Sequence, residues 1–126
     1  MKYKIRQHIV EYLKLNSKDK NSSNKKKKVN LNISSELGVN SENKNLVKFT
    51  NKISLNSELF ELNMNDSFIV ELDNNFDETN KDTNDKIRNE LLSLTFPYSR
   101  VTIMSMMVNF GYGDLAIPLI DLSKDR

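Results

Sequence analysis

The spacing of apolar side chains changes once along the chain, near residue 80, and this change limits the possible folds more than any other feature. Before it, apolar residues fall mainly on alternate positions in four stretches, within residues 3–15, 29–39, 49–55 and 60–72. Such alternation is typical of strands with one buried and one wet face. After residue 80 the apolar spacing becomes helical. The sequence therefore predicts an α+β fold of four strands and one long helix.

The connections between the strands predict how the strands pair. Residues 40–45 join the second and third strands, and residues 56–58 join the third and fourth. Connections this short favour antiparallel neighbours, and alternation on one face is what a half-wetted antiparallel sheet shows. Residues 16–28 hold no apolar side chain and predict a long solvated crossover loop before the second strand. We expect a four-stranded antiparallel sheet, a meander after this crossover, in a single domain over residues 1–126.

The first strand sets an expectation about its two faces. Five of its apolar side chains fall at odd positions, which predicts that these five share the buried face: Tyr3, Ile5, Ile9, Leu13 and Leu15. His8 has the opposite parity. We therefore expect His8 at the surface or at the edge of the sheet.

The helix is expected to begin after an N-cap at Asp82 or Thr83. Pro97 lies in its interior, where the missing N–H predicts a kink one turn earlier. Gly111 and Gly113 are the predicted stop signals.

The expected sheet has more apolar surface than one helix can cover. Four strands spaced by about 4.8 Å span roughly 19 Å, whereas a helix with its side chains is about 10–12 Å wide. The helix itself is apolar on two sides. Exposed apolar surface on this scale indicates a homo-oligomer, a bound partner, or both.

The composition argues against most catalytic chemistry. The chain has no Cys, one His and three Gly. Thiol nucleophiles, cysteine zinc sites and Gly-rich phosphate loops are therefore excluded. A Ser-His-Asp relay would depend on His8, and no G-x-S-x-G sequence accompanies it. We expect a protein that is not an enzyme and that uses no cofactor.

Two segments rich in charged residues raise the possibility of a metal site and of a nucleic-acid site. Asp73, Asn75 and Asp77 have the first spacings of a calcium loop, but Glu78 and Asn84 break the pattern, so no metal is expected. The lysine run at 25–28 could bind a phosphate backbone. No aromatic residue interleaves with it, so a solvated loop is favoured and nucleic-acid binding stays the weaker alternative.

No stretch of 18 apolar residues and no N-terminal signal-peptide pattern occurs. The expected location is the cytoplasm, without membrane insertion.

The helix and the segment after it resemble the SecB family of export chaperones. The resemblance rests on the sequence L-T-F-P-Y-S-R at residues 94–100, then Gly111, then the apolar run L-A-I-P-L-I-D-L at residues 115–122. By motif it covers about residues 94–122, and by the order of predicted elements nearly the whole chain.

The resemblance implies a cytoplasmic chaperone that holds unfolded or precursor proteins without ATP, as a dimer or tetramer, and passes them to the SecA motor. One branch of the family protects antitoxins of toxin–antitoxin systems. Three differences stand out. The sequence has neither the second helix nor the acidic tail of the family, and the crossover loop lacks aromatic residues. The wet face offers Asn63 and Asn65 where the family is acidic, which disfavours SecA. A dedicated chaperone or adaptor for one partner, such as an antitoxin, is the alternative.

The resemblance and the apolar pattern together give two sets of candidate residues. The predicted client-binding residues are Tyr12, Leu31, Ile33, Phe68, Phe110, Tyr112, Leu115, Ile117, Leu119, Ile120 and Leu122. The predicted oligomer interface consists of Leu92, Phe96, Tyr98, Arg100, Ile103 and Met107. For Arg100, a surface ion pair and a buried pair with Glu90, Asp114 or Asp121 are both open. Met104, Met106 and Met107 fit core or oligomer packing better than an adaptable binding surface.

Overall fold

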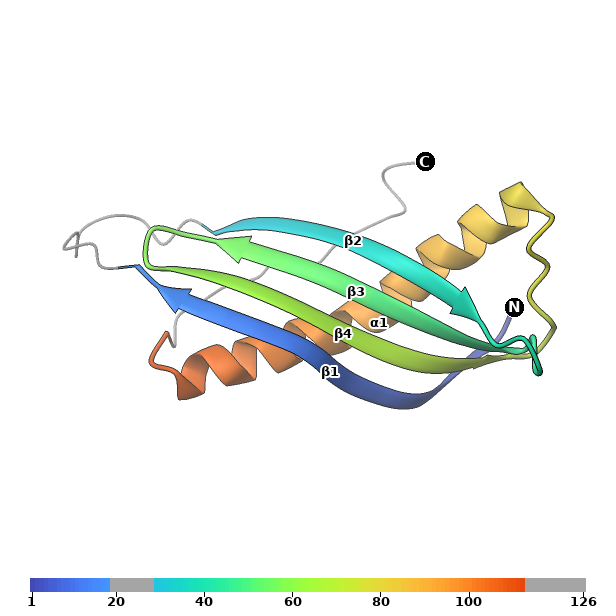
Figure 1. The fold of residues 1–126 in the computed structure, drawn as a ribbon, viewed down its shortest axis with the longest axis horizontal. Coiled ribbons are helices and arrows are strands. Elements are labelled where there is room, and N and C mark those ends of the chain that lie inside the picture. Colours follow the sequence, from blue (N-terminus) through green and yellow to red (C-terminus); the bar gives the residue numbers. More distant parts are fainter. Residues whose placement is uncertain (19–28, 113–126) are drawn as a thin grey trace.

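The computed structural model describes residues 1–18 and 29–112. It contains one four-stranded sheet in the order β1-β4-β3-β2, with every neighbouring pair antiparallel. The strands are β1 (Tyr3–Ser17), β2 (Asn30–Val39), β3 (Leu46–Asn56) and β4 (Phe60–Leu72). One helix, α1 (Lys81–Asn109), crosses a single face of this sheet diagonally (Figure 1). The predicted α+β architecture is confirmed.

The first short connection lies where the sequence predicts it, and the second is shifted by one residue. Residues 40–45 separate β2 from β3, and residues 57–59 separate β3 from β4. The second connection is closed by the N–H of Ser57, which donates to the carbonyl of Phe60 at 3.0 Å. These tight links fix the antiparallel register of the three consecutive strands.

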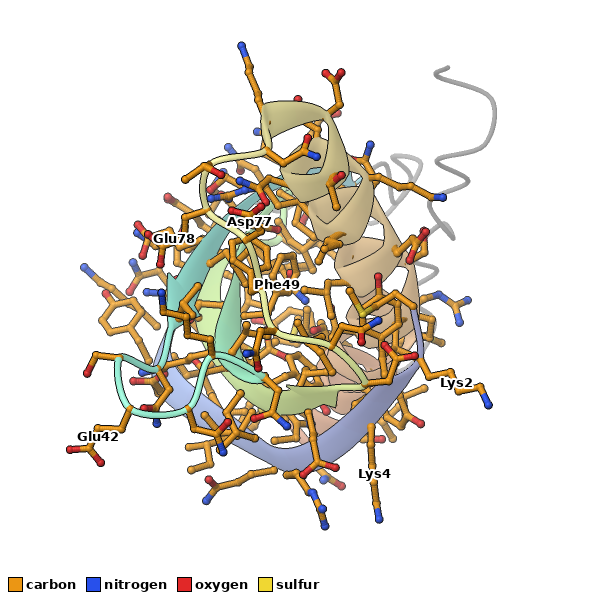
Figure 2. The ribbon with its side chains drawn as sticks, turned by 90° about the vertical axis from the view of Figure 1, so that its right-hand side faces the viewer. Lys2, Lys4, Glu42, Phe49, Asp77 and Glu78 are labelled. Atoms are coloured by element: carbon orange, nitrogen blue, oxygen red, sulfur yellow. The ribbon has the colours of Figure 1, made fainter. Side chains whose placement is uncertain are left out.

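The core lies between the sheet and α1 and consists of two apolar clusters. Cluster one contains Ile53, Leu55, Phe60, Leu62, Met64, Phe96, Ile103 and Met107. Cluster two contains Val47, Phe49, Phe68, Val70, Leu72, Phe76, Ile87 and Leu91. Phe49 lies between the sheet and the helix, whereas Lys2, Lys4, Glu42, Asp77 and Glu78 point outward (Figure 2).

The other face of the sheet is polar, as the alternation predicts. Its charges form pairs between neighbouring strands, including Lys52 with Glu36 at 2.5 Å and Arg6 with Glu71 at 2.9 Å. A shallow hollow on this face is lined mainly by amide, hydroxyl and ammonium groups: Asn32, Ser34, Lys52, Ser54, Asn63 and Asn65.

The prediction for the faces of β1 is wrong in its middle. The register shifts between Ile5 and Gln7, and it shifts again between Val10 and Tyr12. Each bulge inserts one residue and reverses which side chains face the core. Between the two bulges the even positions therefore face α1, so His8 turns inward and Ile9 lies on the wet face.

The predicted helix start is also wrong. The N-cap is Asn80, whose side-chain oxygen accepts from the N–H of Thr83 at 3.2 Å, so Asp82 and Thr83 lie inside the helix. Pro97 lies within one continuous helix. The stop at Gly111 is confirmed: its φ of 93° is in the left-handed region that favours glycine. Gly113 lies outside the described residues.

By length and composition alone, α1 is the one helix of the described residues that could cross a membrane. A core helix meets the same criterion. Here α1 buries Ile87, Leu91, Phe96, Ile103 and Met107 against the sheet.

Candidate polypeptide-binding surface

Cluster one is incompletely covered, and its border forms the candidate binding surface. Nine partly buried apolar side chains surround the cluster, and we call them the open apolar rim: Leu15, Val29, Leu31, Ile33, Leu59, Leu92, Met104, Met106 and Tyr112. They come from both edge strands and the residue before β2, from the β3–β4 connection, and from α1 and the short segment after its end. The rim therefore surrounds the half of the core under the C-terminal part of α1.

Three predicted client-binding residues belong to this rim. Leu31 and Ile33 are half-buried on the helix side of β2, opposite Leu55 and Ile53 of β3. Tyr112 packs on Phe60, with ring centroids 5.1 Å apart, and its hydroxyl donates to Ser17 at 3.1 Å. The structure brings these three side chains to the same apolar cluster.

Three other predicted residues lie elsewhere. Phe110 is exposed at the end of α1. Tyr12 is exposed on the wet face of β1, opposite Asn65, so it cannot share one groove with Leu31 and Ile33. Phe68 is fully buried, so a client could reach it only if neighbouring side chains moved.

The remaining predicted client-binding residues fall outside the described residues, and their role stays a prediction: Leu115, Ile117, Leu119, Ile120 and Leu122.

The predicted interface residues divide into two groups. Phe96, Ile103 and Met107 are buried against the sheet of the same chain, and Leu92 and Arg100 are half-buried. Tyr98 is exposed, together with Val101 and Val108 further along α1. The apolar surface that α1 presents to solvent is therefore carried by Tyr98, which belongs to the predicted set, and by Val101 and Val108, which do not.

A row of polar side chains separates the two apolar clusters, and we call it the polar belt: Ser35 of β2, Asn51 of β3, Asp66 of β4, His8 of β1, and Thr95 and Ser99 of α1. Ser35 lies opposite Asn51, and Asn51 lies opposite Asp66 in the sheet register. Asn51, Asp66, Thr95 and Ser99 are fully buried. The belt therefore crosses the whole sheet under the helix.

Hydrogen bonds link the members of the belt. Ser35 donates to Asn51 Oδ1 at 3.1 Å, and Asn51 Nδ2 donates to Thr95 Oγ1 at 3.0 Å and Ser99 Oγ at 3.2 Å. Ser99 Oγ donates to Asp66 Oδ2 at 2.5 Å. His8 Nε2 lies 2.8 Å from the same oxygen. Burial raises the pKa of the Asp66 carboxyl, while the bonds from Ser99 and His8 act in the opposite direction.

This geometry does not form a nucleophilic relay. Ser99 and His8 both contact the carboxylate of Asp66, whereas a Ser-His-Asp relay needs the serine bonded to the imidazole. Within residues 1–18 and 29–112, no group of three or more His, Asp or Glu side chains could hold a metal ion.

Sequence reasoning missed the belt, although a signal for it exists. The alternation of apolar residues is interrupted once in each of three strands, at Ser35, Asn51 and Asp66. The helical stripe is interrupted at Thr95 and Ser99. Reading these gaps together would have predicted one buried polar row, but only after the register was known. His8 could not be included, because the bulge that turns it inward leaves no clear sequence mark.

No family model matches the chain, and no curated protein matches it. Among solved structures, the fold is similar to that of the Rv1957 SecB-like chaperone from Mycobacterium tuberculosis, determined in complex with a ChAD peptide from the Rv1956 HigA1 antitoxin. The TM-score is 0.71, and the alignment covers 94% of this chain and 88% of that one at 10% sequence identity. At this identity the likeness shows a shared fold. The resemblance to SecB-like chaperones is thus confirmed for the fold.

Proposed function

We propose that this chain, as one domain over residues 1–126, is a SecB-like chaperone that holds unfolded or precursor polypeptides without ATP. The observation that carries the proposal is the shared fold with a SecB-like chaperone that was solved with a bound peptide. The open apolar rim supports it, because half-buried apolar side chains around an incompletely covered core are what an unfolded client could complete.

Binding at the rim would combine two contributions. Burial of apolar client side chains gives about 25 cal/mol for each Å² removed from water. In addition, β2 is an edge strand of the described sheet, so an extended client can pair with its backbone. Leu31 and Ile33 alternate along β2 with polar residues, so such a client would place every second side chain beside the rim.

The test is suppression of aggregation of a chemically unfolded model protein, in the absence of ATP. We compare the double variant Leu31→Thr/Ile33→Thr with the matched variant Leu37→Thr/Val39→Thr. All four positions are half-buried on the same face of β2, but the second pair packs on cluster two. The rim variant should lose most of its holding activity and the control should keep it. Equal losses would show that Leu31 and Ile33 are ordinary core residues, and an inactive wild type would refute the proposal.

A homo-oligomer and a cytoplasmic location belong to the same proposal. Several rims in one oligomer would hold a long client with greater avidity than one rim. The wet face does not favour handover to SecA, because Asn63 and Asn65 lie there where the family is acidic. Binding of purified SecA to the client-loaded protein tests it directly.

A dedicated chaperone or adaptor for one partner is the second candidate. The peptide in the similar structure comes from an antitoxin, and this supports a partner of that kind for the dedicated role. Affinity purification separates the two candidates: one partner in stoichiometric amount supports the dedicated role, and many precursors support the general one.

A further inference from the structure

Asp66 has an unusual environment for a carboxyl group. It is fully buried at the centre of the polar belt, and its two oxygens differ in their partners. Oδ2 accepts a hydrogen bond from the Ser99 hydroxyl and lies 2.8 Å from His8 Nε2, whereas Oδ1 is buried with no hydrogen-bond partner. A buried carboxylate oxygen without a donor is costly, so the folded protein favours a proton in this pair.

His8 is the titratable group in contact with Asp66, and it links the pair to solvent. Its ring stacks on Phe68 with centroids 4.1 Å apart and planes inclined by 10°. Its side chain is 24% exposed, whereas that of Asp66 is fully buried. A proton can therefore leave the pair through the imidazole. With one proton the pair has no net charge, and without it a negative charge stays in the core.

We propose that His8, Asp66 and Ser99 form a proton-dependent latch, which holds β1 and β4 against α1 while the pair carries one proton and loosens when that proton leaves to solvent. The latch has a clear mechanical position. His8 belongs to an edge strand, Asp66 to a central strand and Ser99 to the helix, so a single carboxyl joins three elements between two separate apolar clusters.

The other charged groups near the pair have separate partners or positions. On β1, Arg6 pairs with Glu71 and Glu11 pairs with Lys48. On β3, Lys52 pairs with Glu36. On α1, Tyr98 and the half-buried Arg100 flank Ser99 in sequence.

The latch also lies under exposed apolar surface. The ring of Phe68 contacts that of Tyr98, with centroids 6.3 Å apart, and Tyr98 is exposed on α1. Loosening at His8 would therefore change the support of a side chain that faces solvent. The latch does not depend on the proposed chaperone function, and its test needs no client.

The test measures hydrogen-exchange protection of the α1 amides from residue 95 to residue 103 over a pH series, corrected for intrinsic exchange. Release of one proton limits the effect to about a tenfold loss of protection for each pH unit. We expect a loss approaching this limit in the wild type as pH rises, and protection independent of pH in Asp66→Asn. Glu71→Gln is the matched control, because it neutralises an exposed carboxyl of the same strand and should keep the wild-type slope.

A second measurement makes the test independent of the variant's folding. The carboxyl carbon shift of Asp66 is followed by NMR in the wild-type protein over the same pH series. Titration of that shift together with the loss of protection supports the latch. Protection that stays constant while the shift titrates overturns it, as does an Asp66→Asn protein that folds and keeps the wild-type slope.

Discussion

At the scale of single residues, the core is unusual because polar side chains occupy positions that the strand pattern reserves for apolar ones. Asn51 uses its amide in both directions: it accepts from Ser35 on one strand and donates to Thr95 and Ser99 on the helix. Such bonds add little net stability, but leaving their partners unsatisfied is expensive. They also favour one register, because a shift of one residue along β3 would break all of them.

Asn51→Ala should therefore lower the free energy of unfolding by about 1–3 kcal/mol, because buried partners lose their bonds. Ser54→Ala is the control: it removes a hydroxyl from the wet face of the same strand and should cost about 0.5 kcal/mol or less. Urea unfolding at neutral pH gives both values. If Asn51→Ala costs no more than Ser54→Ala, the belt does not contribute to stability as argued.

Tyr3 makes a second polar link between β1 and α1, and it predicts an effect at alkaline pH. Its hydroxyl donates to Glu90, and burial, this bond and the nearby charge of Glu90 raise the pKa of Tyr3 above its ordinary value of 10.0. The folded state then binds the proton more tightly than the unfolded state. The contribution to stability is present below pH 10 and is lost as pH rises above it.

Tyr3→Phe should remove this alkaline loss. The difference in unfolding free energy between wild type and Tyr3→Phe should shrink as pH rises from 9 to 11, since all other groups titrate alike in both proteins. Tyr12→Phe removes the hydroxyl of an exposed tyrosine of the same strand and is the matched control. Parallel curves for wild type and Tyr3→Phe would contradict the assignment.

At the scale of elements, the start of α1 gives a direct comparison of two cap assignments. The sequence predicts Asp82 or Thr83, whereas the structure places the cap at Asn80, whose side chain accepts from the N–H of Thr83. Asn80→Ala should cost about 1 kcal/mol of stability, the usual value for a lost N-cap. Thr83→Ala should cost less, because its N–H remains. Thermal or urea unfolding of the two variants measures both losses of stability. A larger loss for Thr83→Ala would support the cap assignment predicted from the sequence.

The strands show which features of the fold can be predicted from the alternation of apolar and polar residues. In β2, β3 and β4, hydrophobic spacing predicts the faces and the short connections predict antiparallel pairing, because no bulge interrupts the pairing of these strands with one another. The residue-by-residue register is known only from the structure. In β1, two bulges reverse the faces of His8 and Ile9, and the local spacing of apolar residues does not mark where the bulges lie. The site follows the same rule. Leu31 and Ile33 share one face of β2, as their common parity predicts, whereas Tyr12 and Phe68 lie on opposite faces of the sheet. A role of these residues in client binding stays a prediction.

At the scale of the whole molecule, apolar exposure is the dominant feature. Ile9 and Tyr12 are exposed on the wet face of β1, Val10 and Leu13 on its helix side, and α1 adds a further exposed stripe. An edge strand with apolar side chains on both faces is prone to pair with another chain. Together with the open rim, these surfaces are the apolar side chains that a single chain leaves exposed to water.

The stripe on α1 offers the sharpest test of assembly. Val101 and Val108 are 58% and 57% exposed, so charged replacements there should not disturb the protomer core. If copies associate through this face, Val101→Asp/Val108→Asp buries two charges and loses two apolar contacts, which should weaken association by at least about tenfold for each residue. Native mass spectrometry over a concentration series, with and without an unfolded client, measures the change. Asn89→Asp is the control, because it adds a charge at an exposed position of the same helix and should leave the oligomer unchanged. A wild type that stays monomeric, or a double variant with the wild-type mass profile, would show that copies do not meet at this face.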